Sequence, residues 1–442
     1  MNTRISIHHI GGRDGHGPFP MLSRFEPDFV LTYYDADADC VEQIKERNQY
    51  LKSEVHVLPY CLGRGSGQAT LFINYDPYTS SLLPPNPDYR DYRALTNYGA
   101  FGREFDYVLG EAMRPMEKRA ISTVGLDELL SSGRFGSAPP DFLSIDTQGA
   151  EYDILTGARQ VLQQSTLAVY LEVEFHPMYA GQKLFGDISS LLAGQGFLFV
   201  GFSGEVSPFT PCHSPITLRG GGIQLHEEAL FIRGVDSVSG DPDERHRCLQ
   251  LHKLAFLSVI FNQVEMAAEC LRLAEASREV GAVRDELASL EYGRFLAEFG
   301  SAIRRQPAFF PATFASQFTF EASRSRFTTA GQRGVRWIEL LRDWCVREQW
   351  RWRLLKRLLQ PISSGSRRLA LLFKLASAGK PFWRHPALQW RTEVERVLRR
   401  YGLGAQEKIV RRNRWRHSPF CEEVTAAGPS DGSPAGSQTR AA

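Results

Sequence analysis

The stretch FLSIDTQGAEYDILTGA, residues 142–158, decides the fold of this chain. The apolar run at 141–146 predicts a buried strand, and the spacing of apolar residues over about 150–162 predicts a helix directly after it. A turn at 147–151 connects the two elements. Ligands of open α/β sheets bind at the carboxyl ends of the strands, so Asp146, which ends this strand, is a candidate site residue.

Strand and helix patterns alternate on both sides of this stretch. The sequence predicts strands at 4–10, 29–35, 55–62, 69–73, 166–175, 196–202 and 229–233, and helices at 39–51 and 187–192. Such alternation is typical of a largely parallel sheet covered on both faces. We therefore expect a doubly wound α/β domain over 1–235. The Tyr- and Pro-rich stretch 76–118 within it is interpreted as an unusually long connection, functional or disordered.

The composition excludes several classes of protein. With 442 residues, 43% of them apolar and 23% charged, the chain is too hydrophobic for general disorder and too polar for a membrane protein with many spans. Its seven cysteines are scattered and form no CxxC pair, so neither a disulfide framework nor a zinc knuckle is indicated. We find no secretory signal and no run of roughly 18 apolar residues. The expected location is the cytoplasm.

The C-terminal part of the chain differs in charge from the rest. The net charge is only +2, yet 333–417 is strongly basic and contains all seven tryptophans, whereas 1–332 is mildly acidic. We expect a linker at 236–244, a helical region at 245–332, a basic Trp- and Arg-rich helical region at 333–417 and a disordered tail at 418–442.

The basic region has two kinds of interpretation. Its apolar face can pack against the rest of the protein while the arginines remain solvated. Alternatively, it binds an anionic partner: a membrane surface or glycolipid, an acidic glycan, or nucleic acid. We favour a membrane surface or glycolipid, or an acidic glycan, over nucleic acid. Binding to a membrane surface would place the protein at the inner face of the membrane.

A glycine-rich loop follows the first predicted strand. Gly11 and Gly15 lie in GGRDGHG, whose backbone can approach a ligand closely because glycine lacks a side chain. The loop satisfies neither GxGxxG nor GxxxxGK[ST], and a glycine-rich turn without a ligand is the alternative. Asp35 ends the second strand, where a carboxylate can accept hydrogen bonds from ribose hydroxyls, although Asp37 and Asp39 follow closely.

Three titratable residues alternate in YLEVEFH. Because strand side chains repeat every second residue, Glu172, Glu174 and His176 are predicted to share one face of the sheet. They could form a general-base system or part of a metal site, and we disfavour the metal. A purely structural role, such as a helix cap or a hydrogen bond at the sheet's end, is the other interpretation.

The strings FLSIDTQGAEYDILTGA, LEVEFHPMYAGQKLFGDISSLL, GFLFVGF and HEEALFIR, in this order, resemble the FkbM-type methyltransferases, which depend on S-adenosylmethionine. The resemblance covers about 5–235. It implies a class I methyltransferase-like, Rossmann-like sheet, followed here by the mostly helical C-terminal region. The implied activity is O-methylation, often of a hydroxyl of a sugar, a glycan or a glycolipid-linked acceptor.

The resemblance also implies residue roles. Gly11 and Gly15 would belong to the cofactor loop, Asp35 would hold the ribose, and Ser81 resembles a serine beside the cofactor. Asp146 would line the cleft for methyl transfer.

Glu174 and His176 would then face the acceptor. Asp146 and His176 are the candidate general bases, His176 being favoured by its ordinary pKa near neutrality. His9 departs from the pattern, since an acidic residue usually stands two positions before the first glycine.

Two other functions remain open from the sequence. The α/β domain could be a non-catalytic remnant in a binding protein whose basic region contacts an anionic partner, and His9 favours that alternative. A nicotinamide oxidoreductase is disfavoured by the missing GxGxxG motif.

Overall fold

The computed structural model describes residues 2–11, 19–20, 22–36, 38–98, 103–133, 138–203, 208–211, 222–304 and 389–403. Contacts divide the chain into two compact units, Met1–Glu298 with Arg399–Ala442, and Phe299–Leu398. We call the first unit the body. Most of the basic region and all of the predicted tail at 418–442 lie outside the described residues, and so does Gly15.

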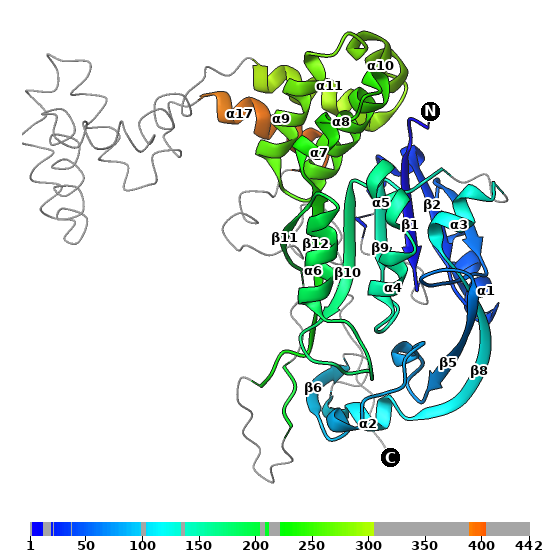
Figure 1. Cartoon of the computed structure of the whole chain (residues 1–442). Coiled ribbons are helices and arrows are strands. Elements are labelled where there is room, and N and C mark those ends of the chain that lie inside the picture. Colours follow the sequence, from blue (N-terminus) through cyan, green and yellow to red (C-terminus); the bar gives the residue numbers. More distant parts are fainter. Residues whose placement is uncertain are drawn as a thin grey trace, which may run out of the picture. The chain divides into compact units, whose positions relative to one another are not determined.

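A seven-stranded sheet forms the centre of the body (Figure 1). Its strand order is β11-β12-β10-β9-β1-β2-β3. All pairings are parallel except those of β12, which runs antiparallel to both of its neighbours. The strands are β1 Ile5–Ile10, β2 Phe29–Tyr34, β3 Glu54–Leu58, β9 Phe142–Ile145, β10 Ala168–Glu174, β11 Phe197–Phe202 and β12 His226–Arg233. The predicted α/β class with a doubly wound, mostly parallel sheet is confirmed.

The strand order reverses at β1. This strand pairs with β2 on one side and with β9 on the other, and every residue of β1 is buried. Ligands of open α/β sheets bind at such a switch point, beyond the carboxyl ends of the strands. The topology therefore directs attention to the segments that follow β1, β2 and β9.

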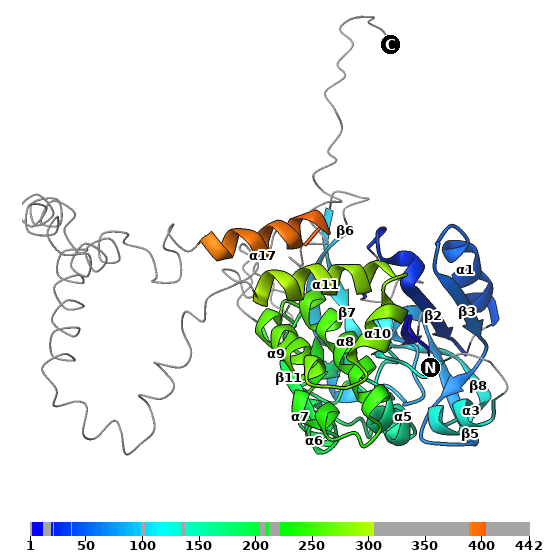
Figure 2. The same ribbon diagram turned by 90° about the horizontal axis from the view of Figure 1, so that it is seen from above.

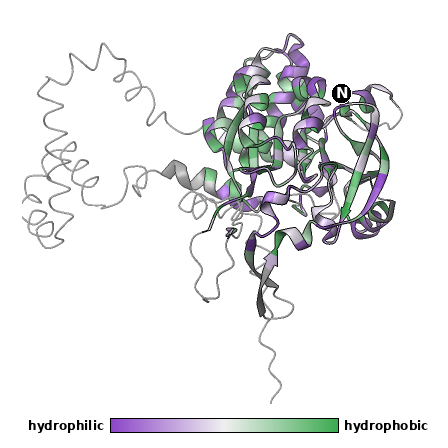
Figure 3. Ribbon diagram, turned by 60° about the horizontal axis from the view of Figure 1, so that its bottom comes forward, coloured by the Kyte–Doolittle hydropathy of each residue, from purple (hydrophilic) through white to green (hydrophobic). Residues whose placement is uncertain are grey.

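Helices cover both faces of the sheet. Seen from above, α1 (Ala38–Asn48) lies on one side, and α5 (Arg159–Gln164) and α6 (Phe185–Gly194) lie on the other (Figure 2). On the second side, apolar residues of the strands pack with those of α4 (Glu151–Thr156), α5, α6 and α3 (Leu126–Ser131). Figure 3 shows hydrophobic and hydrophilic residues side by side on the packed helices, as expected for amphipathic elements.

The helix predicted over about 150–162 is two helices, α4 and α5, separated at Gly157. A Cβ at this glycine would lie 2.2 Å from the carbonyl oxygen of Gly63, so only glycine fits there. The carbonyl oxygen of Gly157 also accepts a hydrogen bond from the backbone N–H of Asp127. This close approach of three segments interrupts a helix that the apolar spacing alone would continue.

The stretch 76–118, interpreted from the sequence as a long connection, contains regular structure. The hairpin β6 (Arg93–Tyr98) and β7 (Arg103–Val108) is followed by α2 (Leu109–Ala112) and β8 (Pro115–Val124). Strand β8 pairs with β5 (Gly67–Asn74) and β4 (Cys61–Leu62) in a small second sheet. The predicted strand 55–62 is thus two strands in two sheets, because the chain leaves the main sheet after Leu58. Short 3-10 turns are η1 Glu26–Asp28, η2 Pro77–Thr79 and η3 Pro87–Tyr89.

Helices after the sheet pack on the amino-terminal ends of its strands (Figure 1). They are α7 Val235–Ser239, α8 Glu244–Ile260, α9 Val264–Glu275, α10 Val280–Leu287 and α11 Glu291–Arg304, which runs into the second unit. Phe256 of α8 lies 5.1 Å from Phe25, ring centre to ring centre, and the backbone N–H of Tyr292 donates to Asp28 over 2.8 Å. The helices and the sheet therefore share one core.

A buried ion pair also joins these helices to the sheet. Lys253 of α8 donates to both carboxylate oxygens of Asp141, over 2.8 and 3.1 Å, directly before β9. Asp141 also accepts the backbone N–H of Ser6 over 2.8 Å, and its pKa is raised by burial, against the opposing charge of Lys253. The pair replaces hydration that both charges lose in the core.

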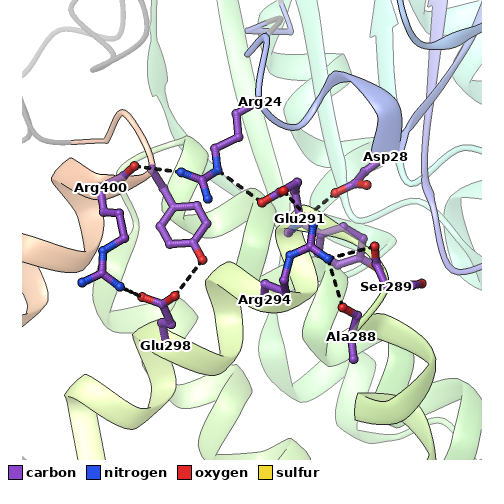
Figure 4. A network of polar contacts seen from close by, with 10 residues as sticks. Arg24, Asp28, Ala288, Ser289, Glu291, Arg294, Glu298 and Arg400 are labelled. Carbon is purple, nitrogen blue, oxygen red and sulfur yellow. Dashed lines mark hydrogen bonds and ion pairs between the residues drawn. The ribbon is translucent and has the colours of Figure 1, made fainter.

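Arg400, the last residue of α17 (Gln389–Arg400), contacts the body (Figure 4). The guanidinium of Arg24 lies 4.0 Å from the ring centre of Tyr401 and donates to the carbonyl oxygen of Arg400 over 3.0 Å. Tyr401 donates to Glu298 over 3.0 Å, and Arg400 forms an ion pair with the same carboxylate over 2.5 Å. This network fastens the chain at 400–401 to its N-terminal part.

Among the described residues, no helix is both long and apolar enough to cross a membrane.

Candidate active site

Three predicted site residues follow the strands at the switch point. Gly11 comes after β1, Asp35 after β2 and Asp146 after β9. The backbone N–H of Gly11 donates to the carbonyl oxygen of Tyr34 over 3.1 Å, and that of Asp146 donates to Ile10 over 3.0 Å. These bonds place the three residues on neighbouring strand ends. The cofactor residues Gly11 and Asp35 therefore lie where the sequence analysis expected them, although their roles stay predictions.

The histidines of β1 are buried and neutral. The ring of His9 shares a hydrogen bond of 2.9 Å between Nδ1 and the Ser144 hydroxyl, and burial lowers its pKa to about 4. His8 lies between the Tyr34 hydroxyl at Nδ1 and the Ala138 carbonyl at Nε2, each over 3.0 Å, and burial lowers its pKa to about 3. At neutral pH His9 thus adds no charge where an acid was expected.

Glu151 shapes the turn between β9 and α4. Its carboxylate accepts hydrogen bonds from the N–H and the hydroxyl of Thr147, over 2.8 and 2.9 Å, and from the N–H of Gly149, over 2.9 Å. Burial raises the pKa of Glu151 to about 7, against these stabilising bonds. These contacts show that Glu151 organises the turn.

The turn holds Gln148 in an unusual backbone conformation. Gln148 has φ +56° and Gly149 has φ +107°, both in the left-handed region. The buried hydroxyl of Ser81 donates to the carbonyl oxygen of Gln148 over 2.6 Å. Ser81 therefore fixes the backbone of the turn, and its place beside the cofactor stays a prediction.

One amide connects two carboxylates at the carboxyl ends of β9 and β10. Nε2 of Gln148 donates to Oδ1 of Asp146 over 3.0 Å and to Oε2 of Glu172 over 2.5 Å. Its Oε1 accepts from the hydroxyl of buried Tyr179 over 2.9 Å. The amide group has two hydrogens, so it can serve both acids at once.

The pKa of Asp146 is raised well above its ordinary value. Desolvation by the surrounding protein contributes, and so does repulsion from Glu172. Since Asp146 is still exposed to solvent, repulsion is the cause that the geometry supports best. An acid with a raised pKa can hold or accept a proton near neutral pH.

Glu174 is the most enclosed acid of the site. Glu174 is 0% exposed, and neither oxygen of its carboxyl group has a hydrogen-bond partner among the described residues. Gln182 lies close enough to favour the charged form slightly, but its amide nitrogen is outside hydrogen-bond geometry. Burial, followed by the charges of Glu151 and Glu172, raises the pKa of Glu174 well above its usual range.

His226, at the start of β12, was not identified from the sequence. Its Nδ1 lies 2.9 Å from Oε1 of Glu172. Burial alone would lower the pKa of His226, but the hydrogen bond and charge of Glu172 outweigh burial and raise it. The sequence prediction began this strand at 229, which left His226 outside the sheet; the antiparallel pairing that brings it to β10 has no local sequence signal.

His176 follows the end of β10. Strand β10 ends at Glu174, so the alternation that predicted a shared face does not extend to His176. Its ring centre is 6.2 Å from that of Tyr89, and within the described part of the chain no hydrogen bond joins its side chain to Asp146 or Glu174.

Among the described residues, no group of three or more His, Cys, Asp or Glu side chains has the arrangement needed to hold a metal ion. Two acids of the site, Asp146 and Glu172, are connected by Gln148, a neutral donor.

Comparisons with known proteins give a family match for part of the chain. Residues 25–199 match the family described as the methyltransferase FkbM domain, a range that includes Asp35, Asp146 and His176 but neither Gly11 nor His226. No curated protein matches the chain. The crystal structure of a methyltransferase FkbM from Methylobacillus flagellatus KT aligns with 10% sequence identity and a TM-score of 0.26, over 52% of this chain and 44% of that one. The chain thus spans less than half the length of that relative.

Proposed function

We propose that the chain, which carries a methyltransferase FkbM domain over residues 25–199, methylates a hydroxyl group with S-adenosylmethionine as the donor. The acceptor class that we propose is a sugar of a glycan or a glycolipid-linked saccharide. The domain match supports methyl transfer in general, and the chemistry of the site supports this donor and an uncharged acceptor.

The observation that carries the proposal is the charge of the site. Asp146, Glu172 and Glu174 gather at the strand ends, and among the described residues no Lys or Arg forms an ion pair with any of them. S-adenosylmethionine, when bound, supplies a methyl group on a positively charged sulfur. Carboxylates are a favourable environment for such a cation, and an anionic group would be repelled.

Individual residues fit the donor. Asp35 lies next to the switch point, where a carboxylate can accept both hydroxyls of a ribose. Its negative charge reaches this edge of the sheet, because it raises the pKa of Cys61 together with burial. The buried carboxyl group of Glu174 has no hydrogen-bond partner among the described residues and so can bind a donor group of a ligand.

A methyl-transfer assay tests this function. The full chain is incubated with S-adenosylmethionine labelled with tritium in the methyl group and with methyl glycosides of glucose, galactose, mannose and rhamnose. We expect label in the saccharide that survives mild alkali, since a methyl ether is stable whereas a methyl ester is hydrolysed. Label that alkali releases, or label in no saccharide, would contradict the proposal; Asp35→Ala serves as the donor-binding control.

We also propose that the basic region 333–417 binds an anionic membrane surface, from the sequence alone. Arginine and tryptophan together are typical of segments that lie at membrane interfaces. The full chain should float with vesicles that contain phosphatidylglycerol and should remain unbound to vesicles of phosphatidylcholine. If the chain floated equally with both vesicle types, or with neither, the result would contradict membrane binding. Binding of the chain to immobilised RNA instead would favour a nucleic-acid partner.

A further inference from the structure

His226 contacts Glu172 across two antiparallel strands. The pairing register places His226 opposite Glu174, and its imidazole reaches diagonally to Glu172, with Nδ1 2.9 Å from Oε1. Glu172 is itself fixed from the other side, because its Oε2 accepts from the Gln148 amide. The imidazole is therefore oriented by a carboxylate that cannot turn away without losing a second hydrogen bond.

The second ring nitrogen of His226 is available. With Nδ1 donating to Glu172, a neutral imidazole carries its lone pair on Nε2. In the part of the chain that the structure describes, no hydrogen bond to Nε2 is found, and 23% of the side chain is exposed. A carboxylate that holds one nitrogen of an imidazole while the other accepts a proton is the arrangement that activates hydroxyl groups in hydrolases.

We propose that His226 is a catalytic base of this site and that Glu172 is its positioning residue. This inference rests on the proposed function. Nε2 accepts the proton of the acceptor hydroxyl, while the hydroxyl oxygen bonds to the methyl carbon; the carbon–sulfur bond breaks and its electron pair stays on sulfur. The positive charge lost from sulfur reappears on the imidazolium, beside Glu172, and then leaves as a proton to water.

The surrounding charges suit this role. Glu172, Glu227 and Asp146 all favour the imidazolium, so His226 binds a proton more strongly than an ordinary histidine. The sequence-based candidates have other surroundings. His176 has no carboxylate partner of this kind in the described structure, and Asp146 shares the Gln148 amide with Glu172.

Donor binding tests the position of His226 without an acceptor. S-adenosylmethionine carries a sulfonium charge that S-adenosylhomocysteine lacks, so a protonated His226 beside the methyl group weakens binding of the first ligand selectively. Calorimetry is carried out with both ligands from pH 5.5 to 8.5. In the wild-type chain, the affinity for S-adenosylmethionine divided by the affinity for S-adenosylhomocysteine should rise about fivefold or more with pH. In His226→Gln the part of this rise that is caused by deprotonation of His226 should vanish.

The remaining acids define the controls. Asp146, Glu151 and Glu174 have raised pKa values and titrate in both chains, so the difference between wild type and His226→Gln isolates the imidazole. His176→Gln should keep the wild-type curve. Glu172→Gln should keep the rise but move its midpoint to lower pH, and it carries the test if His226→Gln does not fold.

Two results overturn the inference in different ways. Superimposable curves for wild type and His226→Gln, or an unmoved midpoint in Glu172→Gln, would show that His226 does not lie beside the reacting group. Absence of binding of either ligand at every pH would remove the proposed function itself.

Discussion

A side chain at Gly11 would place its Cβ 1.7 Å from the carbonyl oxygen of Asp146. Gly11 also has φ +85°, a backbone conformation that favours glycine. The end of β1 can therefore approach the end of β9 this closely only because residue 11 has no side chain. This contact closes the sheet edge at the point where the strand order reverses, and it makes Gly11 a structural requirement of the candidate site.

Gly11→Ala should therefore destabilise the protein more than its backbone angle alone explains. Gly133 is a matched control, because it has φ +62° but no neighbouring atom within 4 Å of its Cβ position. Gly133→Ala should cost about 1–2 kcal/mol of unfolding free energy from the left-handed backbone, and Gly11→Ala clearly more. Urea unfolding of both variants checks this; equal losses would contradict the close contact.

Gln148→Leu should separate the effects of the shared amide. Without the amide, Asp146 and Glu172 repel each other unscreened, and Tyr179 loses an acceptor. We expect a loss of roughly 1–3 kcal/mol of unfolding free energy, larger at pH 8 than at pH 5.5, because the raised pKa of Asp146 lets this acid take up a proton and lose its charge as the pH falls. Adding Asp146→Asn should restore part of the loss at pH 8. A loss independent of pH would show that the two acids do not interact through Gln148.

The buried His9 predicts loss of stability in acid. Its pKa is about 4 in the folded protein and 6.5 when unfolded, so below pH 6.5 only the unfolded state takes up the proton. From pH 7 to pH 5 this lowers the unfolding free energy by about 2 kcal/mol. His9→Asn, which can keep a hydrogen bond to Ser144, should lose that much less over the same interval.

Glu151 acts in the opposite direction. Its folded pKa of about 7 lies above its ordinary 4.5, so its contribution falls as pH rises between these values. The comparison of His9→Asn with wild type removes this shared effect. Identical pH profiles of the two chains in urea unfolding would rule out the burial of a neutral His9.

The ion pair of Lys253 and Asp141 tests whether the helices belong to the same folding unit as the sheet. Lys253→Met leaves a buried carboxylate unpaired and should cost about 3–5 kcal/mol. Lys253→Met combined with Asp141→Asn should recover much of that loss. If the single variant unfolds in two steps with the sheet unaffected, the helical region predicted from the sequence at 245–332 folds separately from the sheet.

The sequence predicted the positions of those site residues that belong to a local pattern. An apolar strand that ends in Asp146 and a glycine after the first strand place both residues by chain direction alone, and Asp35 follows by the same rule. Ser81 was placed by the family resemblance, and its hydrogen bond to Gln148 shows why a serine lies there.

What the sequence missed depends on pairing between distant segments. Gln148 and His226 become candidate site residues only through their contacts with Glu172 of β10. Gln148 lies in the turn after β9, and His226 lies on β12. The interruption at Gly157 likewise requires the chain at Gly63 to approach it. Periodicity describes one segment at a time, so an antiparallel strand that carries a histidine to a neighbouring carboxylate leaves no pattern to read.

The most direct test of the account is calorimetric titration of the full chain with S-adenosylmethionine and S-adenosylhomocysteine at pH 8. Asp35→Ala is compared with Asp236→Ala, which changes an exposed acid on α7, one of the helices at the amino-terminal ends of the strands. We predict a Kd in the micromolar range for the wild type and for Asp236→Ala, and loss of binding in Asp35→Ala. Absence of binding to the wild-type chain, or equal binding by Asp35→Ala, would contradict a donor site at the carboxyl ends of β1, β2 and β9.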